Sequence, residues 1–426
     1  MRKLSDIIDN EALDYAMYTV ENRAIPSVID GFKPVHRFIL TMALQVAKND
    51  FAKVAAIAGS VSSLGYNHGE VSAQDACKLL ASDWSNNVPF LHGRGNFGSR
   101  LVNDSAAARY IYAKVHQNFF DIYKDMDILE AHSDLEIKTP KYYIPIIPTV
   151  LLNSIEGVAT GFATKILPYS LRDIKKAVAQ CLAKKPLDTL VPTFPQFKGS
   201  VSRDGNRVTM SGIYNLTGYK LTITEIPIGF DREKYVILLD KLEELDKIIA
   251  YEDRCDKNGV HFVIKLRRTL KWDDKKVIAL FKMEKTITEN ITTLDESGKL
   301  KIFNSPEDLV IYFVEYKMGV LKKRIDFMKS KVSSEIELNL VRVKWIKANL
   351  NGEVDYKNLS KKSLEKLIGD KYGNKFIEKL IPMNLYQLTT DEIEKLEGKL
   401  QDSELRLEYW KGQNQLSQYI ADIKSI

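Results

Sequence analysis

The residues best suited to covalent chemistry lie in the segment "DSAAARYIYAKV", residues 104–115, where Arg109 directly precedes Tyr110 behind a run of alanines. A tyrosine can attack as a nucleophile, although a free phenol, with a pKa of about 10, is a weak one at neutral pH. A neighbouring guanidinium would stabilise the negative charge that develops during the attack. Tyr112 offers a second phenol. The alternative interpretation is a β-strand whose aromatic side chains only pack.

Cationic side chains gather in two further segments, both near glycine turns and expected helix starts. The segment "RAIPSVIDGFKPVHR" contains Arg23, Lys33, His36 and Arg37, and "GYNHGE" contains His68. Helix N-termini bind phosphate through their free N–H groups and dipole, and cationic side chains at the same place add charge. Taken singly, these segments also fit a cluster of surface charges. Taken together, they predict a phosphate-binding surface.

Other kinds of site find little support in the sequence. The chain has no Gly-x-x-x-x-Gly-Lys loop for ATP, and its histidines and cysteines lack metal-ligand spacing. Asp125 and Asp127 lie two residues apart in an expected helix, where such side chains point away from each other. We interpret them as a solvated helix end and expect no metal site in this chain.

Composition places the protein among intracellular globular proteins with more than one domain. No apolar run approaches the roughly 20 residues that a membrane helix needs, and the N-terminus lacks the apolar stretch of a signal peptide. Cys77, Cys181 and Cys255 are odd in number and widely spaced, so they form no disulfide framework. The net charge of +6 is weak support for a polyanionic partner. A chain of 426 residues is too long to fold around a single hydrophobic core, so more than one domain is expected.

The elements that must position the candidate residues begin with a helical stretch and a mixed one. Residues 1–150 combine short helices, one of which starts at Pro34, with the tight turn "GYNHG" and the glycine-broken "GRGNFGSRL". This order is typical of a helix-turn-helix followed by a wing. Residues 151–305 alternate apolar strands, such as "YKLTITEIP" and "HFVIKLRR", with the helix "REKYVILLDKLEEL". That alternation predicts an α+β domain.

Residues 306–426 are expected to form a long helical arm. One seam of a long amphipathic helix recurs every three or four residues and consists of Leu321, Ile325, Met328, Val332, Ile336, Leu340, Val343 and Ile346. After a compact tip at about residues 350–390, Thr390 is expected to cap a second helix that continues through "QNQLSQYIADI". One helix out and one back predict an antiparallel coiled-coil arm.

Seven segments, in this order, resemble the DNA breakage-reunion subunit of type II DNA topoisomerases, the family that includes the gyrase and topoisomerase IV breakage-reunion chains. They are "RAIPSVIDGFKPVHR", "GYNHGE", "GRGNFGS", "DSAAARY", "VLLNSIEGVATGFAT", "ITEIP" and "IPMNLYQLTTDEIEKL". The resemblance covers essentially the whole chain. Within this family the chain is most similar to the members from T-even-type bacteriophages, because it is short and lacks ATPase and carboxylate-metal motifs.

The resemblance to the family implies three domains. They are a winged-helix domain with the catalytic tyrosine over residues 1–150, a tower domain over 151–305 and an arm over 306–426 that ends in a dimerising exit gate.

The resemblance also assigns roles to individual residues. It implies that Tyr110 attacks a DNA phosphorus, aided by Arg109, to leave a 5′-phosphotyrosine link and a free 3′ hydroxyl. The residues implied to contact DNA are Arg23, Lys33, His36, Arg37, His68, Arg94 and Val158. Val158 would wedge between base pairs to bend the duplex, whereas the residues alone favour a buried valine there. Relatives usually have one more residue between the alanines and the arginine, so Tyr112 stays an alternative to Tyr110.

We therefore expect the DNA-cleaving subunit of an ATP-dependent type II topoisomerase. It would act as a homodimer on double-stranded DNA and would not associate with membranes. If a phage encodes it, it would work in the cytoplasm of the host cell. A large partner subunit would hold Mg²⁺ and hydrolyse ATP. The chain ends after the arm without a DNA-wrapping domain, which by resemblance implies relaxation of DNA. The alternative is a non-enzymatic, DNA-bending architectural protein with a helix-turn-helix and a coiled-coil dimer, which would leave no protein-linked DNA.

Overall fold

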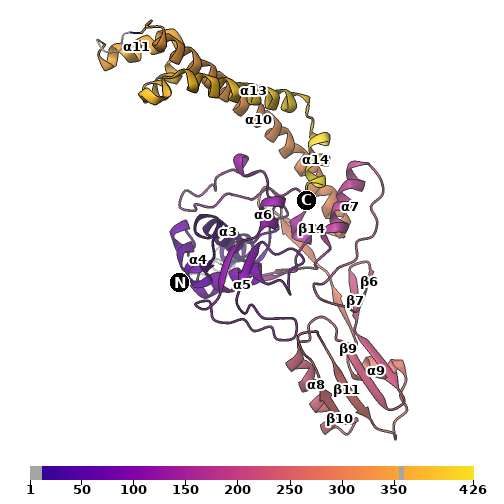
Figure 1. Cartoon of the computed structure of the whole chain (residues 1–426). Helices are drawn as coiled ribbons and strands as arrows, with labels where there is room; N and C mark the ends of the chain where they lie inside the picture. The colour runs from indigo at the N-terminus through magenta and orange to yellow at the C-terminus, as the bar shows by residue number, and fades with distance from the viewer. Residues whose placement is uncertain (1–11, 355–358) are drawn as a thin grey trace, which may run out of the picture. The chain divides into compact units, whose positions relative to one another are not determined.

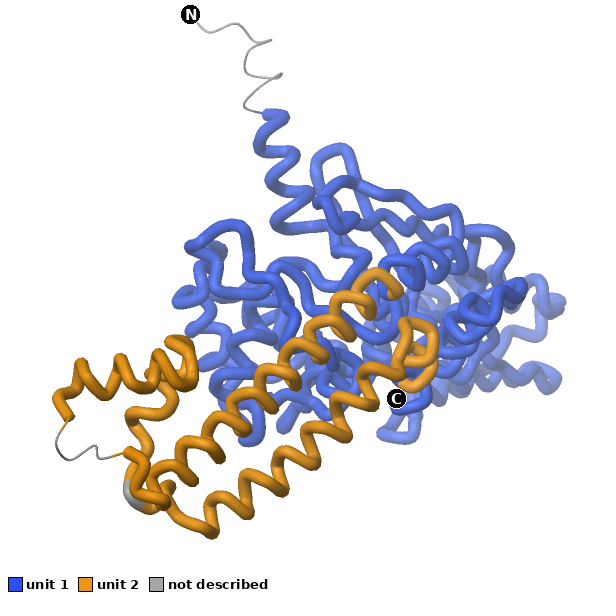
Figure 2. The backbone as a smooth tube through the Cα atoms, turned by 90° about the horizontal axis from the view of Figure 1, so that it is seen from above, with its two compact units in different colours: residues 1–317, 422–426 blue, residues 318–421 orange. Residues whose placement is uncertain are grey.

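The computed structural model describes residues 12–354 and 359–426, which belong to two compact units (Figures 1 and 2). The first unit is Met1–Lys317 with Asp422–Ile426, and the second is Met318–Ala421. The division falls inside the long helix α10 (Pro306–Leu350). The predicted start of the arm at residue 306 therefore lies in the first unit, while the predicted boundary at residue 150 stays a prediction.

The first unit opens with the helices that the sequence predicts. They are α2 (Leu13–Thr19), continued by the π-helical turn η2 (Val20–Ala24), α3 (Pro34–Val46), α4 (Val54–Ser60), the 3₁₀ turn η3 (Val61–Leu64) and α5 (Glu70–Ala81). A small antiparallel sheet with the order β1-β3-β2 accompanies them, built from β1 (Ala52–Lys53), β2 (Leu91–Arg94) and β3 (Tyr112–Val115). The predicted helices at Pro34 and after "GYNHG" are confirmed.

The turn before α5 depends on a glycine. Gly65 has a φ of +96°, and a Cβ atom on it would lie 2.5 Å from the carbonyl oxygen of Glu136. Both the left-handed backbone and the close approach of another segment exclude a larger residue. The glycine in "GYNHG" thus fixes the direction in which the chain enters α5.

A second group of elements links this helical part to the rest of the unit. It comprises α6 (Gln117–Ile122), the 3₁₀ turns η4 (Met126–Ile128) and η5 (Thr149–Leu151), the hairpin β4 (Ile155–Ala159) and β5 (Phe162–Ile166), α7 (Leu171–Leu182), and the hairpin β13 (Ile291–Leu294) and β14 (Leu300–Phe303). Strand β13 also lies against β5, and Val28 N–H donates to the Leu294 carbonyl at 2.8 Å. The segments around Ile25 and Leu294, far apart in sequence, therefore share one small core.

The interpretation of Asp125 as part of a solvated helix end is wrong. Helix α6 stops at Ile122, and Asp125 turns inward, where it is 4% exposed. Its carboxylate accepts a hydrogen bond of 2.5 Å from the Nζ atom of Lys317, which is itself fully buried. The partner lies 192 residues away, so no local pattern could have identified it.

The middle of the chain forms two antiparallel sheets. The three-stranded sheet β12-β7-β6 contains β6 (Ser200–Asp204), β7 (Arg207–Ser211) and β12 (Glu284–Thr288). The four-stranded sheet β10-β11-β9-β8 contains β8 (Ile213–Thr217), β9 (Lys220–Glu225), β10 (Ile248–Asp253) and β11 (Phe262–Leu266). Helices α8 (Arg232–Glu244) and α9 (Asp274–Leu280) accompany the larger sheet. The predicted strands "YKLTITEIP" and "HFVIKLRR" pair directly as β9 and β11, with α8 between them in sequence.

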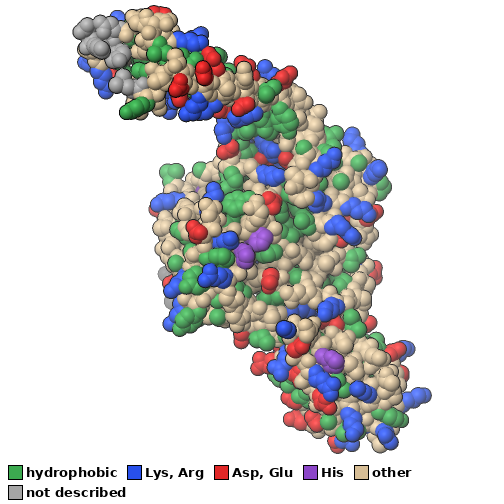
Figure 3. Space-filling model, viewed as in Figure 1, with side chains coloured by type: hydrophobic (Ala, Val, Ile, Leu, Met, Phe, Trp, Pro, Cys, Tyr) green, Lys and Arg blue, Asp and Glu red, His purple; other side chains and the backbone are tan. Residues whose placement is uncertain are grey.

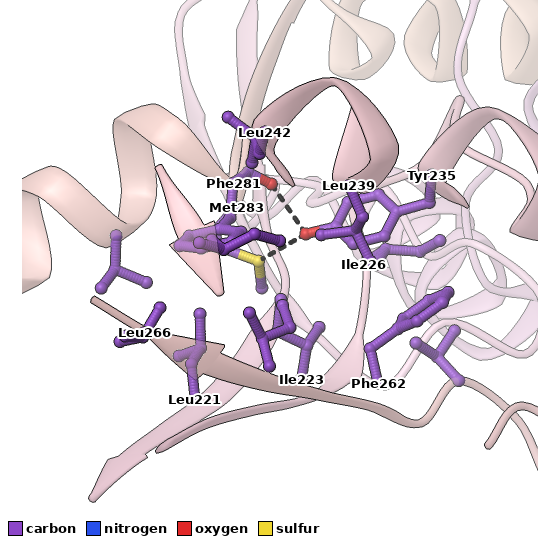
Figure 4. Close-up of a cluster of buried hydrophobic side chains, with 14 residues drawn as sticks. Leu221, Ile223, Ile226, Tyr235, Leu239, Leu242, Phe262, Leu266, Phe281 and Met283 are labelled. Carbon is purple, nitrogen blue, oxygen red and sulfur yellow. Dashed lines mark hydrogen bonds between the residues drawn. The ribbon is translucent and has the colours of Figure 1, made fainter. Parts of the chain in front are cut away.

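Alternate residues of these strands build the core in Figure 4. Leu221 and Ile223 from β9, and Phe262 and Leu266 from β11, point to one side of the sheet and pack with Tyr235 of α8. The buried Tyr235 hydroxyl donates to the Phe281 carbonyl at 2.8 Å, so its polar end is satisfied. The period-two pattern of the strands therefore produces the mixed fold that the sequence predicts.

The second unit holds most of α10 and, after it, α11 (Lys361–Tyr372), η7 (Asn374–Phe376), α12 (Ile377–Leu380), η8 (Leu385–Gln387), α13 (Thr390–Gly412) and α14 (Gln415–Lys424). Helices α10 and α13 run side by side (Figures 1 and 2) and share two apolar clusters. Val343 and Ile346 meet Ile393 and Leu396 in one, and Val332 meets Trp410 in the other. The predicted pair of helices, one out and one back, is confirmed.

Three details of this pair were predicted wrongly. Leu340 is 43% exposed and belongs to neither of the clusters that α10 and α13 share, although Ile336 and Val343 on either side of it do. The N-cap of α13 is Thr389, whose hydroxyl accepts from Glu392 N–H, and Thr390 is the first helical residue. The returning helix also ends at Gly412, because Asn414 starts α14 with a cap: its Oδ1 accepts from Ser417 N–H at 2.8 Å.

Within the described part of the chain, no helix combines the length and apolarity needed to cross a membrane.

Candidate functional site

Tyr110 lies at the end of a short turn, Ala108–Tyr110, immediately before β3. The first N–H groups of α4 hold this turn from below: Ala55 N–H donates to the Ala108 carbonyl at 3.1 Å and Val54 N–H to the Ile111 carbonyl at 3.0 Å. These donors have no partner within their own helix, so the turn caps α4 while α4 fixes the turn. Ala108 and Ile111 are buried, whereas Tyr110 is 69% exposed. The phenol is thus accessible on an anchored backbone.

Arg109 and Tyr110 face each other across the turn. The guanidinium carbon of Arg109 lies 5.6 Å from the centre of the Tyr110 ring, and both side chains are exposed. Tyr112 also has an arginine beside its ring, but it differs from Tyr110 in exposure and in its place in the backbone. It is half-buried in β3, pairs with Arg94 of β2, and has the Arg94 guanidinium 5.6 Å from its ring centre. The geometry favours Tyr110 as the accessible phenol.

The loop before this turn folds back against the segment that follows β2. Ala106 N–H donates to the Asn96 carbonyl at 2.9 Å, which folds the alanine run back onto the segment after β2. Gly98 has a φ of +84°, and a Cβ atom there would lie 2.6 Å from the Asn103 carbonyl oxygen. Small residues therefore let two parts of the same loop touch, and they leave Tyr110 projecting.

Four of the predicted DNA-contact residues line one hollow of about 680 Å³: Arg23, Lys33, His36 and Val158. Residues of α5, among them Asp75, form another wall of it. Val158 lies on the β4–β5 hairpin and is 85% exposed, so the interpretation as a buried valine is wrong. Single exposed apolar side chains are common on protein surfaces, so the place of Val158 beside the cations, rather than its exposure, makes it a candidate contact.

The hairpin that carries Val158 is held by a close backbone contact. A Cβ atom on Gly157 would lie 2.1 Å from the Ala24 carbonyl oxygen, so only glycine lets β4 approach the turn η2. The Lys33 Nζ donates to the Glu156 carbonyl at 2.6 Å, and the Glu156 carboxylate pairs with Lys165 at 2.8 Å. Burial lowers the pKa of Lys33, and the nearby Glu156 charge offsets part of this. Lys33 thus fixes the hairpin beside the hollow.

His36 does not supply the positive charge that the sequence suggested. Burial, followed by the charges of Lys33 and Arg37, lowers the pKa of His36 to about 3, so its ring is neutral at neutral pH. The Nδ1 atom instead accepts from Lys33 N–H at 3.4 Å, which satisfies the N–H group of the N-cap residue at the start of α3. His36 lines the hollow as a neutral side chain that holds the helix start in place.

Arg37 is also buried, but it keeps its charge. Its Nε and Nη2 atoms donate to the two carboxylate oxygens of Asp30 at 2.7 and 2.9 Å. Burial opposes ionisation, but the Asp30 charge outweighs it and raises the pKa of Arg37. The guanidinium also lies 5.0 Å from the ring centre of Tyr142.

Arg37 and His68 line a second hollow of about 520 Å³, together with Tyr18 and Tyr142. The His68 Nε2 and the Tyr18 hydroxyl are 3.1 Å apart. Sequence reasoning missed both tyrosines, because only the fold brings Tyr18 to His68 and Tyr142 to Arg37. Neither hollow is lined by Tyr110 or Arg109. The predicted cations therefore form two groups, and Arg94 belongs to a third, beside Tyr112.

Charge density alone does not single out a DNA surface. On the face that Figure 3 shows, basic and acidic side chains are intermixed over most elements. No group of three or more His, Cys, Asp or Glu side chains among the described residues could hold a metal ion.

Comparison with known proteins identifies the family. The model of the family of DNA gyrase/topoisomerase IV A subunits matches residues 23–424. The chain is 42% identical to the DNA topoisomerase medium subunit of Enterobacteria phage T4, over 100% of this chain and 99% of that protein. It is 29% identical to the mitochondrial DNA topoisomerase 2 of Dictyostelium discoideum, over 93% of this chain and 33% of that longer protein.

A solved structure agrees with these sequence matches. The DNA-binding, cleavage and re-ligation domain of Plasmodium falciparum topoisomerase II superposes with a TM-score of 0.91 and 28% identity, covering 99% of this chain and 63% of that one. A mixed α/β fold of this kind, together with a family match over nearly the whole length, does not favour an architectural protein. The chain belongs to the family of DNA gyrase/topoisomerase IV A subunits and is a breakage-reunion subunit of a type II DNA topoisomerase.

Proposed function

We propose that Tyr110 is the nucleophile of this subunit. Its hydroxyl oxygen attacks a phosphorus of one DNA strand, a Tyr110 O–P bond forms, and the bond from phosphorus to the 3′ oxygen breaks. The phenolic proton is lost and the 3′ oxygen gains one, which leaves a 5′-phosphotyrosyl strand and a 3′ hydroxyl. One phosphodiester replaces another, so the reverse attack by the 3′ hydroxyl reseals the strand without an outside energy source.

The observation that carries this proposal is the contrast between the two candidate phenols. Tyr110 is 69% exposed on a backbone that α4 anchors, whereas Tyr112 is half-buried under Arg94. Arg109 lies against the Tyr110 ring and can approach the same phosphate. Its charge would stabilise the extra negative charge on the phosphoryl oxygens during the attack.

The hollow lined by Arg23, Lys33 and Val158 is the second part of the proposal. Cations at a groove attract the DNA backbone, and an exposed apolar side chain at a hairpin tip can insert between base pairs and bend the duplex. We assign Arg23 and Lys33 to phosphate contacts and Val158 to the wedge. His36 acts through the helix start it caps, and Arg37 and His68 form the neighbouring polar hollow.

Helices α3–α5 with the sheet β1-β3-β2 fit a winged-helix domain, the sheets from β6 to β12 a tower, and α10 with α13 a coiled-coil arm. We propose that two copies of the chain act on opposite strands and dimerise through the tip of the arm. A partner subunit would carry the ATPase and hold Mg²⁺, since the described residues offer no ligand cluster for the metal.

Protein-linked DNA tests this function. The chain, incubated with its partner subunit, Mg²⁺ and a DNA duplex, should leave protein attached to the 5′ ends after quenching with denaturant. Mass spectrometry of the nucleotide-linked peptide then identifies the attached residue. Adduct on neither tyrosine, with the partner present, would remove the proposal.

A further inference from the structure

The outer face of the sheet β1-β3-β2 carries cations stacked on aromatic rings. Cross-strand pairs join Arg94 to Tyr112, His92 to Lys114 and Tyr112 to Lys53, which puts these side chains on one face. The intervening residues, including Ala113 and Val115, are buried against the helices on the other face. The strands therefore point basic and aromatic side chains outward on this face and apolar side chains inward.

Phe51 is the centre of this face. The Lys114 Nζ lies 5.0 Å and the Arg94 guanidinium carbon 5.6 Å from its ring centre, and His92 meets it edge-on at 5.4 Å. Arg94 also covers the Tyr112 ring at 5.6 Å. Such contacts hold the long side chains in place while leaving their N–H groups free to donate.

Among the described residues, the three basic side chains of this face have no acidic partner within ion-pair distance. None of the ion pairs within the described residues involves Lys53, Arg94 or Lys114. Three unpaired cations on one face, of which Arg94 and Lys114 lie over aromatic rings, complement a polyanion rather than a protein surface of mixed charge. The strand that carries Tyr112 and Lys114 begins two residues after Tyr110.

We propose that this face, defined by Phe51, Lys53, Arg94, Tyr112 and Lys114, binds the backbone of the same duplex that Tyr110 cleaves. The inference rests on the proposed function and extends it. Because β3 continues directly from the anchored turn, phosphates held on this face stay in register with the phosphorus that Tyr110 attacks. The face would thus keep the strand beside Tyr110 while the break is open.

The salt dependence of DNA binding tests the contact. In a Tyr110→Phe background, which excludes chemistry, Lys53→Gln with Lys114→Gln should lower the slope of log K against log salt by about 0.9 per lost phosphate contact, or about 1.8 per chain. The matched control, Lys399→Gln with Lys411→Gln, removes two exposed lysines of α13 and should leave the slope unchanged. Lys53→Arg with Lys114→Arg should restore the wild-type slope, which separates charge loss from misfolding.

Covalent adduct formation identifies which duplex is bound. With native Tyr110, partner subunit, Mg²⁺ and one short duplex at subsaturating concentration, the Lys→Gln pair should form less adduct than the control pair. Equal adduct despite a lower slope would mean that the face holds a second duplex, and the inference would be wrong. An unchanged slope, with normal adduct from the wild type, would refute the inference but leave the proposed function standing. Absence of adduct from the wild type would instead refute the proposed function.

Discussion

Two tyrosines with the same chemistry, Tyr110 and Tyr112, have different surroundings in the fold. The Tyr110 ring lies beside Arg109 and is largely open to solvent, while Tyr112 is built into a strand and covered by Arg94. A phenol that must reach phosphorus needs an open approach, and one that packs in a sheet does not have it. The local backbone, through α4, decides which of the two projects.

Replacing each phenol separately tests this assignment. Tyr110→Phe removes the attacking oxygen and keeps the ring, so the variant should bind DNA and form no covalent adduct and no strand-passage product. Tyr112→Phe should retain both activities, with a stability loss of no more than about 1 kcal/mol for one hydroxyl. Quenched cleavage assays of both variants, in the presence of the partner subunit, provide the measurement. Adduct that maps to Tyr112 would reverse the assignment.

His36 makes folding stability depend on pH. Its pKa is about 3 when folded and 6.5 in the ordinary state, so below pH 6.5 the unfolded chain binds a proton that the folded chain does not. This residue therefore leaves the free energy of unfolding unchanged well above pH 6.5. It lowers that free energy progressively as the pH falls from 6.5 toward 3. From pH 6.5 to 5.5 this residue alone should lower the free energy of unfolding by about 1 kcal/mol.

The difference between wild type and His36→Gln isolates this contribution. Glutamine at the third position of a helix can still accept from the N-cap N–H, so α3 keeps its start. Urea unfolding at pH 7 and pH 5.5 should show a smaller loss of stability for the variant. The same loss in both proteins would mean that the folded chain protonates His36.

At the scale of elements, the hairpin β4–β5 presents Val158 because a glycine precedes it. Gly157 lets β4 press against the carbonyl of Ala24, and the Lys33 Nζ holds the Glu156 carbonyl on the same strand. The hairpin is thus fixed on its inner side and exposed at its tip. A rigid apolar tip beside cations is the arrangement that inserting a wedge into DNA requires.

Val158→Ala should separate bending from folding. Because Val158 is exposed, its truncation should change the free energy of unfolding by less than about 0.5 kcal/mol. The bend of a duplex with labelled arms, measured by fluorescence transfer, should decrease, and cleavage should decrease with it. Val191→Ala, at another exposed valine, serves as the matched control and should alter neither. An unchanged bend in the Val158 variant would refute the assignment of Val158 as the side chain that inserts between base pairs.

At the scale of the whole molecule, the arm begins inside the first unit. Leu309 and Phe313 of α10 are buried, and Glu307 at its start accepts from Arg203 at 2.7 Å and from Leu190 N–H at 2.6 Å. Truncation near residue 300 would therefore remove part of the first unit's core together with the arm. Dimerisation is better tested by substitution at the tip, where Tyr386 is 89% exposed.

Tyr386→Asp should weaken the dimer of the full chain. If the tips of two copies meet, the substitution puts an unpaired carboxylate into the interface. The dissociation constant of the dimer should then rise about tenfold or more. Leu405→Asp, at an exposed position of α13 outside the tip, should leave the dimer intact. Light scattering over a concentration series distinguishes the two. Equal dissociation of both variants would place the interface elsewhere.

The sequence alone determined the family, the class of reaction and most elements of the fold. Ordered motifs such as "DSAAARY" and "GYNHGE" identify the family, and periodicity identifies helices α3, α8 and α10 and strands β9 and β11. These signals suffice because backbone conformation and the apolar face of an element depend on residues a few positions apart.

Only the tertiary structure decided the state of individual side chains. It exposed Val158, neutralised His36, buried Asp125 against Lys317 and gave Tyr110 rather than Tyr112 an open approach. Each of these outcomes depends on a partner distant in sequence: the Ala24 carbonyl beneath Gly157, the burial and neighbouring charges around His36, a lysine 192 residues from Asp125, and α4 beneath the turn of Tyr110. Burial and electrostatic environment are properties of what the fold brings together, and a local pattern carries no record of them.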